Sequence, residues 1–259
     1  MRPTIIGSLL DAARHNVSRN RPDAAIFESG TVYRRHGEGS DGRFPADEHH
    51  ALGALMTGSL EPRSWRGGER HEADFFAVKG LLAGLLERFG VHWSVEAEQW
   101  PFLHPGRSAA VLARGEEGRQ VKLGFLGELH PLVAREWDLE RTAAFAIDLG
   151  KLAGVAPEVK AFEAFGAFPP LRQDIAVTLP VEVAARQVLQ AVRKAGGATL
   201  EGAEIFDVYT GAQVGEGRRS LALALSFRAG ERTLTDEDVA PLRARIVEAL
   251  AKLGGELRG

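Results

Sequence analysis

Residues 200–228 decide the fold of the C-terminal half of the chain and read LEGAEIFDVYTGAQVGEGRRSLALALSFR. The end of this stretch alternates strictly, because Leu221, Leu223 and Leu225 are separated by small residues. A period of two predicts a strand with one buried face. Residues 200–209 are a second predicted strand, and the Gly-rich segment 211–217 predicts the loop that joins the two.

Further elements are predicted on both sides of this pair of strands. A strand is expected at 174–179, followed by a helix at 183–195 that Gly196 and Gly197 end. A helix at 235–253 and a short strand at 256–258 follow the pair, and Thr235 and Asp238 have the spacing of a capping box. The order βαββαβ is the ferredoxin-like pattern. Because that fold serves many functions, it does not name one.

The first half of the chain predicts an α+β module rich in short strands. Apolar residues at helical spacing predict helices at 4–17 and 74–89, and Pro131 suits the start of a short helix at 132–137. Residues 151–168 mix Ala, Gly, Pro and charge without a period, so a linker is expected there. The domains expected are a module over 1–158, a linker over 159–168 and a second domain over 169–259. Strands are predicted at 24–35, 50–57, 91–98, 108–113, 120–129 and 142–149.

Composition excludes several classes of protein. The 259 residues include no Cys, so a disulfide scaffold and a Cys-ligated metal site are excluded. With 44% hydrophobic residues and a net charge of -3, the chain is expected to fold. No apolar run approaches the roughly 20 residues of a membrane span. The N-terminus does not resemble a signal peptide, so the expected location is the cytoplasm.

Motifs for catalysis and metal binding are weak. Residues 37–42, Gly-Glu-Gly-Ser-Asp-Gly, match the dinucleotide fingerprint in letters, but no helix start follows, so a loop is expected. His49 and His50 are adjacent on a predicted strand and therefore point to opposite faces. No metal site and no catalytic residue is expected.

Several short stretches, taken in order, resemble the C-terminal part of the β subunit of phenylalanyl-tRNA synthetases. No single one is decisive, but their succession is specific and covers nearly the whole chain. They are residues 1–10 with Asn16, 27–30, 75–80, 104–109, 124–131, 168–169, 172–174, 206–209, 220–222 and 232–237.

The resemblance implies an N-terminally truncated class II synthetase-like antiparallel sheet that has lost catalysis, followed by a ferredoxin-like anticodon-binding domain. The family's other tRNA-binding and editing domains would precede Met1, so a C-terminal fragment is expected. Aminoacylation belongs to the α subunit, so ATP and Mg²⁺ are expected for the whole enzyme and no cofactor for this fragment. The implied partners are tRNA-Phe and the α subunit, in a heterotetramer. The truncated fragment could also self-associate through apolar surface.

The residues agree with the expectation that the first module is inert. Class II adenylation needs one Arg on the motif 2 strand and another on the motif 3 helix to stabilise phosphate charge. Residues 25–28, Ala-Ile-Phe-Glu, carry no Arg, and Arg135 is the first Arg after residues 124–131.

The resemblance also implies the anticodon contacts. Tyr209 matches the aromatic residue that stacks on an anticodon base. Asp207, one strand period away, shares its face and could accept hydrogen bonds from a guanine edge. Ala176, Ser220 and Arg258 match the remaining contacts. Arg218 and Arg219 are further candidates for phosphate contacts because they precede Ser220; the alternative is an exposed loop pair.

Two other functions stay open. A regulatory amino-acid-sensing ferredoxin-like protein would need a Gly-rich ligand loop after its first strand, where Pro180, Val181 and Glu182 stand instead. An active class II ligase would need the missing arginines. Residues 165–259 hold 12 Lys+Arg and 12 Asp+Glu, so electrostatic attraction to RNA is weak and this piece alone should bind tRNA poorly.

Overall fold

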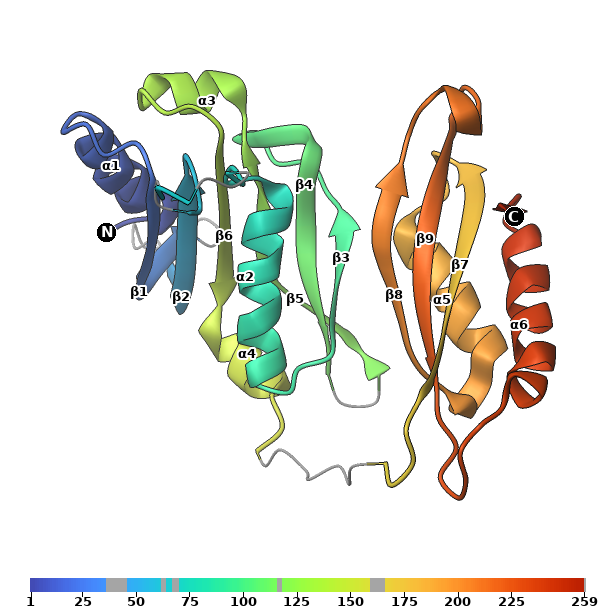
Figure 1. Cartoon of the computed structure of the whole chain (residues 1–259). Helices are drawn as coiled ribbons and strands as arrows, with labels where there is room; N and C mark the ends of the chain where they lie inside the picture. The colour runs from blue at the N-terminus through green and yellow to red at the C-terminus, as the bar shows by residue number, and fades with distance from the viewer. Residues whose placement is uncertain (36–45, 62–63, 67–69, 116–117, 159–165, 259) are drawn as a thin grey trace. The chain divides into compact units, whose positions relative to one another are not determined.

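The computed structural model describes residues 1–35, 46–61, 64–66, 70–115, 118–158 and 166–258. The chain divides into two compact units, Met1–Ala161 (unit 1) and Phe162–Gly259 (unit 2) (Figure 1). The stretch 37–42 that matches the dinucleotide fingerprint lies outside the described residues. Within the described ranges, no helix is long and apolar enough to cross a membrane.

Unit 1 is built on an antiparallel sheet. In the described part of the chain it has six strands in the order β1-β2-β6-β5-β4-β3. All the neighbouring pairs are antiparallel, as expected for this module. The strands are β1 (Ala24–Arg35), β2 (Ala46–Thr57), β3 (Trp93–Ala97), β4 (Leu103–Arg114), β5 (Gln120–Leu129) and β6 (Thr142–Asp148).

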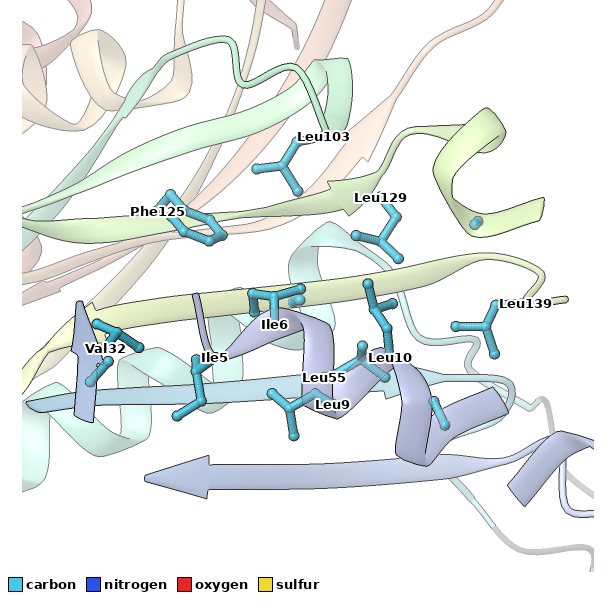
Figure 2. Packing of buried hydrophobic residues seen from close by; sticks show 14 residues of the cluster. Ile5, Ile6, Leu9, Leu10, Val32, Leu55, Leu103, Phe125, Leu129 and Leu139 are labelled. Carbon is cyan, nitrogen blue, oxygen red and sulfur yellow. The ribbon is translucent and has the colours of Figure 1, made fainter. Parts of the chain in front are cut away.

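Helices cover both faces of this sheet. On one face, α1 (Ile6–Val17) buries Ile6, Leu9 and Leu10 against strand residues such as Leu55 (Figure 2). The short α3 (Pro131–Glu136) contributes Ala134 to the same cluster. On the other face, α2 (Phe75–Arg88) and α4 (Leu149–Val155) form a second cluster with the sheet. Each sheet face therefore has its own apolar core.

The expectation of an irregular linker from residue 151 is wrong at its start. Helix α4 occupies Leu149–Val155, where the Asp148 side chain accepts a hydrogen bond from the Lys151 amide at 3.0 Å. Leu152 is buried and Leu149 and Val155 pack against the same cluster, but seven residues are too few for this spacing to mark a helix in the sequence. The cap and these three apolar side chains hold the short helix beside the sheet.

Unit 2 has the predicted βαββαβ order. Its antiparallel sheet runs β10-β7-β9-β8, and the ferredoxin-like α+β pattern is confirmed. Helix α6 begins at the predicted capping box, in which Asp238 and Thr235 exchange hydrogen bonds. Hydrogen bonds from Arg232 and the Thr235 amide hold the pKa of Asp238 well below its usual range. The elements are β7 (Leu171–Pro180), α5 (Ala185–Gly196), β8 (Leu200–Tyr209), β9 (Arg218–Phe227), α6 (Asp236–Ala251) and β10 (Glu256–Arg258).

Candidate nucleic-acid interface

One face of the unit 2 sheet is covered by α5 and α6, and the opposite face is left open by them (Figure 1). The covered face holds the buried residues of the alternating strands, such as Leu221, Leu223 and Leu225 of β9. The residues between them, Ala222 and Ala224, project from the open face and are half-buried. We call this second surface the open face.

A first row of residues crosses all four strands on the open face. Arg258 of β10 pairs with Ala176 of β7, Ala176 pairs with Ala222 of β9, and Ala222 pairs with Asp207 of β8. Directly opposed residues in an antiparallel ladder share a face. The register therefore aligns three of the sequence-predicted site residues in one row.

A second row lies one strand period away. Thr178 of β7 pairs with Ser220 of β9, and Ser220 pairs with Tyr209 of β8. Ser220 is buried, whereas 39% of Tyr209 is exposed. Both rows carry even-numbered residues of β7 and β9, so all five predicted anticodon-contacting residues share the open face.

A β-bulge in β8 decides which face Asp207 and Tyr209 occupy. Ile205 pairs with Leu223 on the covered face, yet Asp207 pairs with Ala222 on the open face, so the ladder skips Phe206. Without this extra residue, alternation from Ile205 would turn Asp207 and Tyr209 toward the helices. The bulge was not predictable, because an alternating pattern in the sequence does not show where a strand gains one residue.

Arg258 and Tyr209 contact each other on the open face. The Arg258 guanidinium carbon lies 5.8 Å from the centre of the Tyr209 ring, within the range of a cation–π interaction. Its Nη2 donates a hydrogen bond to Oε1 of Gln213 at 2.7 Å. A cavity of about 260 Å³ adjoins this group, and its lining includes Thr178 and Glu256.

The two candidate phosphate contacts, Arg218 and Arg219, diverge. Both belong to β9 and not to a loop, so successive side chains point to opposite faces. Arg219 lies on the covered face, where its Nη2 donates to the Val183 carbonyl at 2.6 Å. Arg218 lies on the side of Ser220 and forms an ion pair with Glu256 at 3.2 Å. The structure therefore brings only Arg218 to the candidate interface.

Unit 1 contains an internal ion pair at the strand that the resemblance equates with motif 2. Glu28 of β1 is bound by Arg2 and by the Ser8 hydroxyl, and the Ser8 hydrogen bond is the main cause of its lowered pKa. The Arg2 guanidinium lies so close to Gly30 that a side chain there would collide with it. Arg135, in α3, is exposed. In the described ranges, no three His, Asp or Glu side chains are grouped to hold a metal ion.

Comparison with known proteins assigns both halves of the chain. Residues 1–149 match the family model described as phenylalanyl tRNA synthetase beta chain CLM domain. Residues 166–258 match the ferredoxin-fold anticodon binding domain. The whole chain is 40% identical to the phenylalanine–tRNA ligase beta subunit of Symbiobacterium thermophilum, covering 28% of that protein. It is 36% identical to the corresponding subunit of Geobacillus kaustophilus, covering 31% of it. The chain thus spans less than a third of the length of these relatives.

Proposed function

This chain belongs to the family of phenylalanyl-tRNA synthetase β chains, and we propose that it serves phenylalanine–tRNA ligase as an anticodon-binding and assembly part. Unit 2 binds the anticodon of tRNA-Phe. Unit 1 contributes to the contact with the α subunit, which carries out aminoacylation with ATP and Mg²⁺. The setting is the cytoplasm, where tRNA is charged.

The arrangement of the open face is the observation that carries this proposal. Its centre consists of small side chains, Ala176, Ala222 and Ser220, and its edge on β8 carries Tyr209 and Asp207. A flat surface of small side chains beside an exposed aromatic ring can accept a base that has left the stack of a single-stranded loop. Proteins commonly hold such a base by stacking it on an aromatic side chain. An Asp carboxylate accepts hydrogen bonds and suits the donors on a guanine edge.

Arg258 supports the same proposal. In the free chain its guanidinium rests against the Tyr209 ring. A base that stacks on this side of the ring displaces the guanidinium, which can then reach the phosphate or the base edge. Arg258 is exposed, so its guanidinium can leave the Tyr209 ring and reach an RNA ligand.

The test is the affinity of the full chain for tRNA-Phe and for an RNA hairpin with its anticodon stem and loop. Tyr209→Ala removes the ring and is expected to weaken binding by about 1–3 kcal/mol, the range for one base stacked on an aromatic side chain. Tyr209→Phe keeps the ring and should bind nearly as tightly. Val208→Ala is the matched control, because Val208 pairs with Leu221 of the covered face. Equal affinity of Tyr209→Ala and the unsubstituted chain would sink the proposal.

Exposed apolar side chains in unit 1 support the assembly role. Phe27 is 77% exposed on the outer strand β1, and Phe76 is 73% exposed on α2. Trp65 and Leu132 are also exposed. These four residues belong to different elements of unit 1, so each is a separate candidate for contact with a partner.

A further inference from the structure

Phe206 is a large aromatic residue that the core of unit 2 does not use. Its side chain is 60% exposed, whereas its neighbour Ile205 packs against the core. Alternation after Ile205 turns Phe206 to the open face, and the bulge then keeps Asp207 on that face as well. Phe206, Asp207 and Tyr209 therefore all project from the open face along β8.

Phe206 and Tyr209 each offer an exposed ring on the same edge strand, β8. Two residues lie between Phe206 and Tyr209, so their backbones are at most about 10 Å apart along the strand. Strand β8 is at the edge of the sheet, so the outer side of both residues has no neighbouring strand among the described residues. The geometry leaves room for one base against each ring.

The neighbouring strand keeps the space beside Phe206 flat. Ala222 and Ala224 of β9 oppose the segment around the bulge, and Glu204, which pairs with Ala224, is the charged neighbour of Phe206 on the same face. Neither alanine has a side chain that would prevent a base from lying against the ring, and the Glu204 side chain is exposed to solvent. An exposed Phe beside small residues is thus accessible to a planar ligand.

We propose that Phe206 is a second stacking residue of the anticodon interface, which holds an unpaired base next to the one on Tyr209. Asp207 lies between the two rings and accepts hydrogen bonds from the edge of one of these bases. The inference rests on the proposed function of the open face and adds to it a second base. Binding of successive bases on successive aromatic side chains is a common way to hold single-stranded RNA.

The experiment uses the full chain and the anticodon hairpin, with 2-aminopurine placed in turn at each unpaired loop position. Stacking on an aromatic ring quenches this fluorescent base. Phe206→Ala is expected to weaken hairpin binding by about 5- to 150-fold, the range for losing one stacked base. It should also restore fluorescence at one loop position, and Tyr209→Ala should restore it at a different one. Phe206→Tyr should bind like the unsubstituted chain, and so should the control Val208→Ala.

Phe206→Leu separates stacking from packing, because it keeps apolar volume and lacks the aromatic ring. It is expected to bind as weakly as Phe206→Ala while its thermal unfolding stays close to that of the unsubstituted chain. Unchanged affinity of Phe206→Leu would overturn the inference, and so would a loss of affinity that only accompanies a lowered Tm. If Tyr209→Ala weakens binding and Phe206→Ala does not, the proposed function stands and the second stacking residue is wrong. If neither variant weakens binding, both are wrong.

Discussion

At the scale of single residues, Glu128 shows how unit 1 accommodates a buried charge. Only 3% of its side chain is exposed, at the end of β5. Its carboxylate accepts hydrogen bonds from Arg107 Nε at 2.6 Å, from the Phe75 amide at 3.2 Å and from Arg141 Nε at 3.3 Å. Burial opposes ionisation, but these hydrogen bonds outweigh it and lower the pKa of Glu128. The carboxylate therefore connects β5, the start of α2 and two cations.

Glu128→Gln is expected to lower the free energy of unfolding by about 1.5–3 kcal/mol, because it removes the negative charge that accepts the hydrogen bonds of Arg107 and Arg141. Urea unfolding at neutral pH measures the loss. Glu98→Gln is the matched control: Glu98 pairs with Lys122 in an exposed ion pair, whose loss should cost about 0–1 kcal/mol. A loss for Glu128→Gln no larger than for Glu98→Gln would contradict this account.

The Glu128 carboxylate also makes the difference in unfolding free energy between the unsubstituted chain and Glu128→Gln depend on pH. Its pKa is lower in the folded chain than in the unfolded one, so the unfolded state binds the proton more readily. The stabilisation is therefore fully present above the ordinary Glu pKa of about 4.3 and is lost as the pH falls through the folded value. The difference between Glu128→Gln and the unsubstituted chain should narrow in acid and not in alkali.

The positions of the site residues were only partly predictable from the sequence. Period-two spacing correctly placed Asp207 and Tyr209 on one face, because that rule holds within a strand. Which face it would be depends on the bulge at Phe206, and a bulge is set by pairing with β9, which the sequence does not display. Arg218 and Arg219 are a second example. Both are predicted phosphate contacts, but they are successive residues of β9, so their side chains point to opposite faces of the sheet.

At the scale of elements, the exposed side of α2 carries two glycines that packing within unit 1 does not explain. The helix buries Val78, Leu82 and Leu86 against the sheet. Gly80 and Gly84 are exposed, and a methyl group added at either would meet nothing within 4 Å. A Gly inside a helix costs about 1 kcal/mol relative to Ala. Nothing within unit 1 requires these two glycines.

Gly80→Ala and Gly84→Ala are each expected to raise the free energy of unfolding by about 0.5–1 kcal/mol, since Ala restricts the unfolded chain and fits the helix. Chemical unfolding of the full chain measures the gain. The contrasting variant is Gly53→Ala in β2, where the new methyl group would come within 2.5 Å of Ile5 Cγ2 and should destabilise. No gain in either α2 variant would show that these positions are constrained within the chain.

Elements with a strong hydrophobic period were predicted from the sequence, and weakly patterned ones were not. Helix α2 and strand β9 were predicted because buried residues recur at a fixed spacing over many residues. Helix α4 has only seven residues, too few for the spacing of Leu149, Leu152 and Val155 to predict a helix. Strand β4 begins at Leu103, five residues before the predicted start, because its pairing with β5 is irregular between Leu103 and Ser108. Tertiary pairing, which no local pattern encodes, extends this strand across Pro105.

At the scale of the whole molecule, net charge limits how the chain can hold RNA. Residues 165–259 have no net charge, with 12 Lys+Arg and 12 Asp+Glu. Residues 1–164 contain 20 Lys+Arg and 23 Asp+Glu. On the open face, Arg218 is paired with Glu256, whereas Arg172 and Arg258 are exposed cations. Affinity from counterion release scales with the number of phosphates that are neutralised. The proposed interface should therefore depend on stacking and hydrogen bonds more than on charge.

The salt dependence of hairpin binding tests this distribution of charge. If the exposed cations of the open face neutralise about two phosphates, the logarithm of the association constant should fall with the logarithm of salt concentration with a slope of about -1.4. Doubling the salt concentration then weakens binding only about threefold, and Arg258→Gln should make the slope shallower by about 0.7 because one phosphate contact is lost. Tyr209→Ala should leave the slope unchanged while lowering the affinity, since stacking releases no counterions. A slope steeper than about -4 would require several more cations than the open face offers, and RNA contacts would then have to be sought on other surfaces of the chain.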